Sequence, residues 1–162
     1  MLKRFVTFAA FAAMFLSVGA LAAPPAEWGF LKLPEAMAAA KSANKPVFVL
    51  FGFETCRGCA LLYRQALSDT GLRTTFQKNF ILGYVDTEKH GEPDSYQIGD
   101  GAAQSHAELM SAFRGSPTPS WVFLTPGGVR LHGERGGKTA AWELLRDGDI
   151  AMEKFRAAAS GG

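Results

Sequence analysis

Cys56 and Cys59 are the only cysteines of the chain, and their spacing predicts redox chemistry. They form a Cys-x-x-Cys motif around Arg57 and Gly58, at the point where an apolar strand is expected to pass into a helix. The i, i+3 spacing on a first helical turn brings the two sulfurs within disulfide reach. The unpaired N–H groups of a helix N-terminus and the nearby Arg57 cation stabilise a thiolate. We therefore expect Cys56 to be the attacking sulfur and Cys59 the resolving sulfur.

Other chemistries fit this motif less well. A structural disulfide that closes a loop of two residues gives little chain-entropy stabilisation. A c-type haem motif has His directly after the second cysteine, where this chain has Ala60. A zinc site needs more ligands, and His90, His106 and His132 are expected to be solvated surface residues. A Cu(I) site made of the two thiolates stays open as an alternative.

The segments around the cysteines have the pattern of a β-helix-β unit. Residues 47–53 are a continuous apolar run of strand length, which is typical of a strand covered on both faces. A helical face that packs on the sheet then follows at i, i+3, i+4, i+7 spacing, formed by Cys59, Leu62, Tyr63 and Ala66. Residues 80–85 predict a second strand, joined to the first by a right-handed crossover.

Further elements are expected in the rest of the chain. In order, they are a helix over 36–42, a helix over 72–78 capped by Ser68-Asp69, a helix over 105–113 and a hairpin of residues 121–124 and 129–131. Residues 86–100 are polar and glycine-rich and predict a loop. Two C-terminal helices are expected over 139–145 and 150–158, separated by Asp147-Gly148-Asp149.

Residues 1–22 have the pattern of a secretory signal peptide. Lys3 and Arg4 precede an apolar stretch, and residues 20–22 fit the small-x-small cleavage pattern. The apolar run is shorter than the roughly 20 residues that usually span a bilayer, which disfavours an uncleaved anchor. We expect cleavage near Ala22, one mature domain over 23–162, and a periplasmic or otherwise exported location, where thiols are oxidised unless a pathway reduces them.

The composition is that of an ordinary globular domain and excludes several classes of protein. The chain has 162 residues, of which 48% are hydrophobic and 20% charged. Two cysteines are too few for a disulfide-stapled mini-protein or a four-cysteine zinc site. Two of the 17 basic residues lie within 1–22, so the remaining chain has as many basic residues as its 15 acidic ones. No nucleic-acid partner is therefore expected.

In combination, these motifs resemble the thioredoxin superfamily. The resemblance covers about residues 34–135 and rests on residues 45–51 before the Cys-x-x-Cys motif, residues 85–86 at the end of the next strand, and residues 118–124 before a glycine turn. It implies an α/β thioredoxin-like fold, with a central mixed sheet flanked by helices and a β-α-β unit followed by a C-terminal hairpin and helix. Residues 66–69 and 86–113 are similar to the exported bacterial reductant-type members, including those found with sulfur-oxidation systems.

The resemblance also implies a substrate-binding loop. Thr118-Pro119 matches the peptide that is cis in thioredoxins and that faces the cysteines, where the preceding backbone can pair with an extended substrate segment. Pro117 is the alternative candidate for this cis position. Pro119 is preferred because its distance to the following strand and to Gly127 matches the family spacing.

The chain departs from the thioredoxin pattern at four positions. Thr55 and Gly58 stand where thioredoxins usually have Trp and Pro, and Leu50 and Leu82 replace a buried acid and its accompanying lysine. Replacing both charged residues leaves no buried charge unpaired. It also removes the usual proton acceptor of the resolving cysteine, so Glu54 or water is expected to serve.

Together these features predict an exported protein thiol-disulfide oxidoreductase with no bound cofactor and no metal. Cys56 would attack a disulfide of an exported client protein, and Cys59 would then release the reduced client. The resemblance favours a reductant and implies a membrane thiol electron carrier as its donor; a monomer is expected. The alternatives are a disulfide-forming oxidant or isomerase, and a non-catalytic Cu(I)-binding module.

Overall fold

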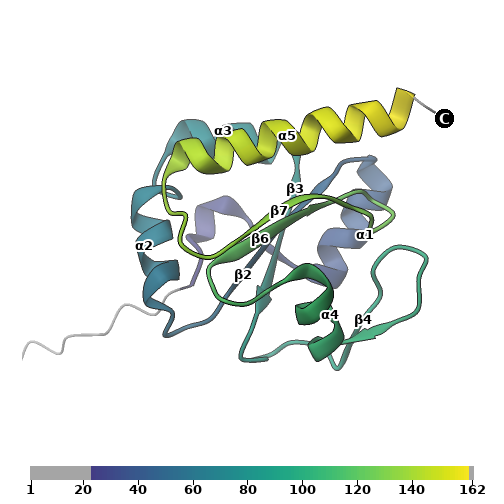
Figure 1. The fold of residues 1–162 in the computed structure, drawn as a ribbon, viewed down its shortest axis with the longest axis horizontal. Coiled ribbons are helices and arrows are strands. Elements are labelled where there is room, and N and C mark those ends of the chain that lie inside the picture. Colours follow the sequence, from purple (N-terminus) through teal and green to yellow (C-terminus); the bar gives the residue numbers. More distant parts are fainter. Residues whose placement is uncertain (1–22, 161–162) are drawn as a thin grey trace, which may run out of the picture.

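A mixed sheet with helices on both faces forms the centre of the molecule (Figure 1). The computed structural model describes residues 23–160, so the expected signal peptide over 1–22 lies outside the described residues. In chain order the elements are η1 (Ala26–Trp28), β1 (Leu31–Lys32), α1 (Leu33–Ala43), β2 (Val47–Gly52), α2 (Arg57–Gln65), α3 (Thr70–Asn79), β3 (Ile81–Asp86), β4 (Ser95–Tyr96), β5 (Gln104–Ser105), α4 (His106–Phe113), β6 (Ser120–Leu124), β7 (Arg130–Arg135) and α5 (Ala141–Ser160).

The strand β2 lies in the middle of the sheet, whose order is β1-β3-β2-β6-β7. It pairs in parallel with β3 and antiparallel with β6, and every one of its residues is buried. A continuous apolar run is what such a doubly covered position requires. The predicted strands over 47–53 and 80–85, the helix between them and the hairpin of β6 and β7 are therefore confirmed.

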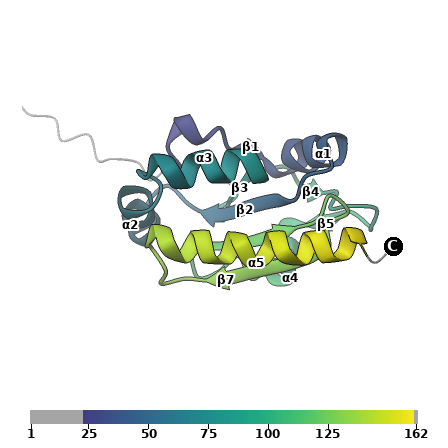
Figure 2. The ribbon, with the colours of Figure 1, turned by 90° about the horizontal axis from the view of Figure 1, so that it is seen from above.

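Two apolar layers hold the helices on the sheet. Because side chains alternate along a strand, Phe48 and Leu50 of β2 face one layer, whereas Val47 and Val49 face the other. The first layer packs α2, α3 and α5 on the sheet, and the second packs α1 and α4. Figure 2, seen from above, shows α3 and α5 side by side over the same face of the sheet, with α2 at one end.

Side-chain caps fix where the helices begin. Asp69 accepts a hydrogen bond from the N–H of Leu72 at 2.8 Å, which caps α3 as predicted. Ser105 and Glu108 form a reciprocal capping box at the start of α4. The helix α1 ends at Asn44, which has the left-handed backbone conformation that asparagine tolerates.

The prediction of two C-terminal helices is wrong, because α5 runs without a break from Ala141 to Ser160. Two of the three residues expected to break it, Asp147 and Gly148, are instead buried against other parts of the chain. The carboxylate of Asp147 accepts a hydrogen bond from Trp121 Nε1 at 3.2 Å, and Gly148 packs against the rings of Phe76 and Phe80. Tertiary packing thus overrides the weak local helix propensity.

Three short strands were not predicted. The edge strand β1 pairs with β3. The strand β4 lies inside the stretch expected to be a loop and pairs with β5, which follows that stretch. Each has two residues, which is too short for a period to be visible in the sequence.

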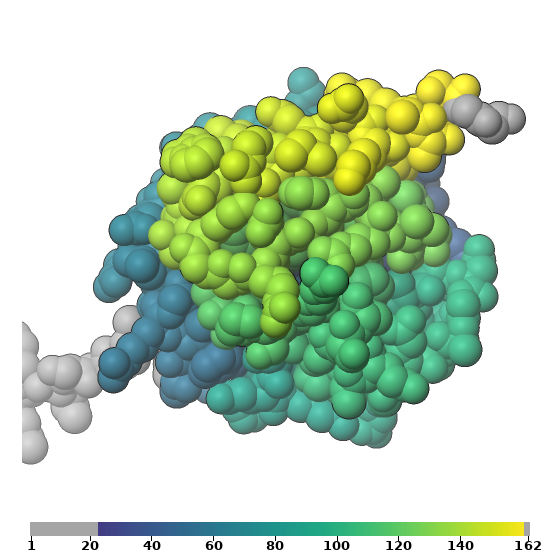
Figure 3. Space-filling model, in the orientation of Figure 1, coloured from purple at the N-terminus to yellow at the C-terminus, as the bar shows by residue number. Residues whose placement is uncertain are grey.

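Within residues 23–160, no helix combines the length and the apolar character that crossing a bilayer requires. The space-filling view shows α5 lying along one side of the molecule, against the end of the β6-β7 hairpin (Figure 3).

Candidate functional site

The two cysteines form a disulfide at the N-terminus of α2. Their Cα atoms are 5.2 Å apart, as the predicted i, i+3 spacing requires. Cys56 is the N-cap residue of α2, and Cys59 lies in its first turn with its side chain fully buried. Cys56 is 4% exposed, so of the two residues it is the one that reaches the surface.

Several donors converge on the sulfur of Cys56. The backbone N–H of Cys59 donates a hydrogen bond to Cys56 Sγ at 3.0 Å, and Thr118 Oγ1 lies 3.3 Å from the same sulfur. When the disulfide is open, the Thr118 hydroxyl and the N–H groups of the helix terminus can both donate to a Cys56 thiolate. The exposed Arg57 adds a positive charge next in the chain. These contacts support the assignment of Cys56 as the attacking sulfur.

The Thr118-Pro119 peptide lies opposite the cysteines and is cis. The Ser116-Pro117 peptide is cis as well, so both prolines weighed for this position adopt the same isomer. Pro119 is the one that contacts the Cys-x-x-Cys segment, because a Cβ placed on Gly58 would come 2.9 Å from its Cδ. The missing side chain of Gly58 thus makes room for Pro119.

The positions of the usual buried acid and lysine are apolar in this structure. Leu50 and Leu82 are buried in the layer that packs α2 on the sheet. Glu54, suggested by the sequence as a proton acceptor, is exposed. Polar groups do gather near Cys59: its Sγ and the hydroxyl oxygens of Tyr63 and Tyr84 all lie within 3.3 Å of the place that a Cβ on Gly52 would take.

Both tyrosine hydroxyls are strongly held in their neutral form. Burial, and next the neighbouring Tyr84 hydroxyl, raise the pKa of Tyr63 far above its usual value. Burial, and next the carboxylate of Asp86, raise the pKa of Tyr84 to about 12. Sequence reasoning missed this pair. Tyr63 could have been found, since it follows Cys59 by four residues and shares its helical face.

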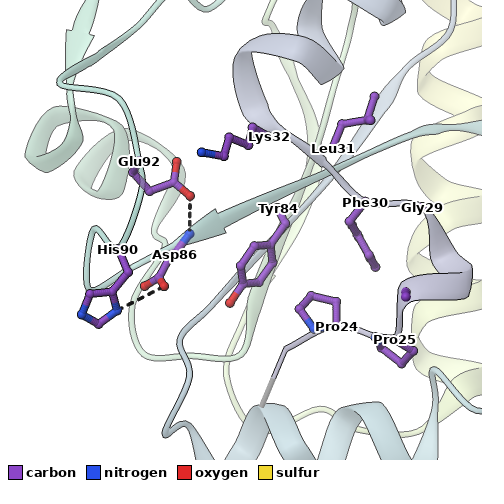
Figure 4. A pocket seen from close by; sticks show the side chains of 11 residues that line it. Pro24, Pro25, Gly29, Phe30, Leu31, Lys32, Tyr84, Asp86, His90 and Glu92 are labelled. Carbon is purple, nitrogen blue, oxygen red and sulfur yellow. Dashed lines mark hydrogen bonds and ion pairs between the residues drawn. The ribbon is translucent and has the colours of Figure 1, made fainter. Parts of the chain in front are cut away.

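A cavity of about 430 Å³ lies beside Tyr84 (Figure 4). Its walls combine apolar side chains from residues 24–31 with the polar groups of Asp86, His90 and Glu92. Glu92 accepts a hydrogen bond from the backbone N–H of Asp86 at 2.9 Å, and His90 Nδ1 lies 3.4 Å from Asp86 Oδ2. Tyr84 therefore belongs both to this cavity and to the surroundings of Cys59.

The histidines differ from the expectation that all three are solvated. His90 is exposed, but His106 Nδ1 lies 3.1 Å from the Tyr96 hydroxyl, and His132 Nε2 lies 3.4 Å from Asp147 Oδ1. The prediction is wrong for His106 and His132 because both lie on elements that pack against a neighbour. His106 begins α4, and His132 stands on β7 under α5.

A group of ligand-type side chains does occur on β7 and α5. Among the described residues, His132, Glu134 and Asp147 place one ligand atom each within 4.8 Å of one another. However, Lys138 Nζ lies 2.7 Å from Glu134, and an Arg146 nitrogen lies 3.0 Å from Asp147. These cations already neutralise the carboxylates, so the group fits a metal ion poorly and instead joins α5 to β7.

Comparison with known proteins agrees with the fold. Spermatogenesis-associated protein 20 from Mus musculus is 30% identical over 100 residues, which are 62% of this chain and 11% of that protein. This chain thus spans only about a tenth of the relative's length.

Two solved structures share the fold. A thioredoxin from Thermus thermophilus superposes with a TM-score of 0.62 at 23% identity, covering 80% of this chain and 91% of that chain. An oxidoreductase named DsbH superposes with a TM-score of 0.56 at 16% identity, covering 89% and 95%. A family model described as a thioredoxin-like domain matches residues 33–147. The chain carries the Cys56–Cys59 disulfide in a Cys-x-x-Cys motif and belongs to this thioredoxin-like family.

Proposed function

We propose that this protein is an exported thiol-disulfide oxidoreductase that reduces disulfides in other exported proteins. The observation that carries the proposal is the Cys56–Cys59 disulfide at the start of α2, facing the Thr118-Pro119 peptide. A disulfide over two intervening residues contributes little to stability through chain entropy, so a stabilising role does not explain it. Donors around Cys56, together with the complete burial of Cys59, match an attacking and a resolving sulfur.

The exchange proceeds in two steps. The Cys56 thiolate attacks a client disulfide, an S–S bond to the client forms, and the other client sulfur leaves as a thiolate that takes a proton from water. Cys59 then loses its proton and attacks Cys56 Sγ, and the second client sulfur leaves. Two electrons have passed to the client, and the protein holds the Cys56–Cys59 disulfide seen in the structure.

In the proposed cycle, a membrane thiol electron carrier reduces the disulfide again outside the cytoplasm. This part of the proposal is supported by the signal-peptide pattern of residues 1–22 and by the resemblance to exported reductants. An exported protein in an oxidising compartment needs such a donor, because its dithiol is otherwise consumed after one turnover. Cell fractionation together with N-terminal sequencing tests it: a cytoplasmic chain that begins at Met1 would contradict export.

The decisive experiment is to trap the mixed disulfide. A Cys59→Ser variant retains the attacking sulfur but lacks the resolving one, so client proteins should stay bound to it through a bond that a reductant releases. A Cys56→Ser variant, which keeps a buried thiol, is the matched control and should trap nothing. Equal recovery of proteins by both variants, or no recovery by Cys59→Ser, would count against the proposal.

A disulfide-forming oxidant is the second candidate, and one observation favours it. The Cys59 N–H, the Thr118 hydroxyl and Arg57 all stabilise a Cys56 thiolate, which stabilises the reduced form and strengthens an oxidant. The reduction potential separates the two candidates. A value near or below about −230 mV supports the reductant, whereas a value of about −180 to −120 mV supports the oxidant or isomerase.

A further inference from the structure

Three polar atoms meet at one point above Gly52, the last residue of β2. A Cβ placed on Gly52 would lie 3.1 Å from Cys59 Sγ, 3.2 Å from the Tyr63 hydroxyl oxygen and 3.3 Å from the Tyr84 hydroxyl oxygen. Any larger residue at this position would therefore separate the three groups. The absence of a side chain on Gly52 leaves the resolving sulfur open to both hydroxyls.

The sequence positions explain why these groups meet. Cys59 and Tyr63 are four residues apart on α2, so both point from the same face of the helix onto the sheet. Tyr84 of β3 pairs in register with Leu50 of β2, and side chains of paired residues lie on the same side of a sheet. Gly52 is two residues beyond Leu50 and shares that side. Thus α2 carries Cys59 and Tyr63, and β3 carries Tyr84, to the space that Gly52 of β2 leaves open.

The Tyr63 hydroxyl is a buried donor without a partner in the oxidised protein. Its oxygen is inaccessible to solvent and makes no hydrogen bond with any of residues 23–160. The Tyr84 hydroxyl is close enough to raise the pKa of Tyr63, with the largest effect after burial itself. An unsatisfied buried hydroxyl is costly, and such groups call for an explanation. The nearby sulfur is that of Cys59, which in a disulfide is a weak acceptor.

We propose that the Tyr63 hydroxyl, with the Tyr84 hydroxyl beside it, donates a hydrogen bond to Cys59 Sγ once the disulfide is open. This inference rests on the proposed exchange function, because it assigns the group that serves the resolving sulfur in that reaction. Reduction adds two electrons and two protons to the Cys56–Cys59 bond and gives Cys59 a free sulfur, a better acceptor than before, above all as a thiolate. The uncharged phenols thereby take the place of the buried acid usual in thioredoxins.

The sign of the effect follows from the state in which the bond exists. A contact made only in the reduced protein stabilises the dithiol relative to the disulfide and so raises the reduction potential. A Tyr63→Phe variant should therefore hold its disulfide more strongly. We expect the equilibrium constant with glutathione to shift about tenfold toward the disulfide, which is about 30 mV more negative.

The test is a redox titration of the full chain against glutathione, with thiols counted at each point by alkylation and mass. Tyr63→Phe is compared with the wild type and with Tyr84→Phe, for which a smaller shift in the same direction is expected. Tyr96→Phe is the matched control. It also removes a hydroxyl from a buried tyrosine. However, Tyr96 lies in the opposite apolar layer and its hydroxyl donates a hydrogen bond to Glu92, so the potential should stay unchanged.

A second measurement guards against a general loss of structure. Urea unfolding of both redox forms should show that Tyr63→Phe weakens the reduced protein relative to the oxidised one, by the same tenfold ratio. A wild-type potential in Tyr63→Phe, or a shift of equal size in Tyr96→Phe, would overturn the inference. Because glutathione is the only partner in this titration, failure to trap a client with Cys59→Ser would overturn the proposed function and leave the Tyr63 result standing.

Discussion

The indole Nε1 of Trp121 donates a hydrogen bond at 3.2 Å to the carboxylate of Asp147, which is completely buried in the middle of α5. Trp121 lies on β6, so this contact connects the sheet to the C-terminal helix. The other oxygen of the carboxylate lies 3.0 Å from an Arg146 nitrogen and 3.4 Å from His132 Nε2. A buried carboxylate held on both oxygens positions the helix more strictly than apolar contacts alone.

Replacing Asp147 by Ala should destabilise the protein by about 2–4 kcal/mol, because the change leaves the buried Trp121 N–H without an acceptor and Arg146 without its partner. The measurement is the midpoint of urea unfolding. Asp149→Ala is the control, since Asp149 lies two residues away and is exposed, and it should change stability by less than about 0.5 kcal/mol. Equal midpoints for the two variants would show that the hydrogen bond from Trp121 to Asp147 contributes no net stability.

Gly148→Ala is expected to stabilise the protein. The new Cβ would lie 3.4 Å from two ring carbons of Phe76, an ordinary contact distance, and alanine is favoured over glycine within a helix by about 1 kcal/mol. The melting temperature should rise by about 2–4 °C. Gly148→Leu, by contrast, overfills the same space and should lower it. A lower melting temperature for the alanine variant would mean that Phe76 cannot accept even one methyl group.

Gly58→Ala should damage both stability and exchange. Its Cβ would come 2.9 Å from Cδ of Pro119, a ring atom that cannot turn aside, so the loop that carries Thr118 must shift away from Cys56. We expect a loss of about 1–3 kcal/mol and slower reduction of the disulfide by dithiothreitol. Gly101→Ala is the control, because its nearest neighbour would be 3.7 Å away. Wild-type behaviour of the Gly58 variant would show that Pro119 is free to move.

Alkaline pH should unfold the protein as its tyrosines ionise. The folded protein holds the pKa of Tyr84 at about 12 and those of Tyr63 and Tyr96 higher still, mainly through burial, against a usual value of 10.0. Their contribution to stability is complete below pH 10 and declines above it, because the unfolded chain releases these protons first. Titration of the phenolate absorbance should show no ionised tyrosine at pH 10 while the protein remains folded. A phenolate signal from the folded protein at that pH would contradict the burial of the hydroxyls.

The sequence was sufficient wherever the determining contacts are local. The apolar run of 47–53, the Asp69 cap and the i, i+3 spacing of the cysteines each involve neighbours within a few residues, and the structure has them as expected. Glycine between two aspartates suggested a break in α5 for the same reason. The residues that prevent the break, Trp121 and Phe76, are far away in the chain.

The surroundings of Cys59 were beyond sequence reasoning for a related reason. The helical face shared by Cys59 and Tyr63 is visible in the spacing, but the approach of Tyr84 depends on the register between β2 and β3. A shift of one residue would turn Tyr84 to the other face of the sheet. The sequence therefore showed that the usual acid was missing, whereas the structure showed what occupies its place.

The outer strand β7 closes the sheet to further strands. The carbonyl of Leu131 accepts a hydrogen bond from Lys154 Nζ at 2.9 Å, and the carbonyl of Gly133 accepts one from an Arg130 nitrogen at 3.3 Å. Charged side chains thus occupy backbone groups that an incoming peptide would need, a common protection against edge-to-edge aggregation. The opposite edge, β1, offers only two residues. A concentrated solution of this protein should accordingly resist fibril formation. Under the proposed function, the loop before β6 is the docking place for an extended client.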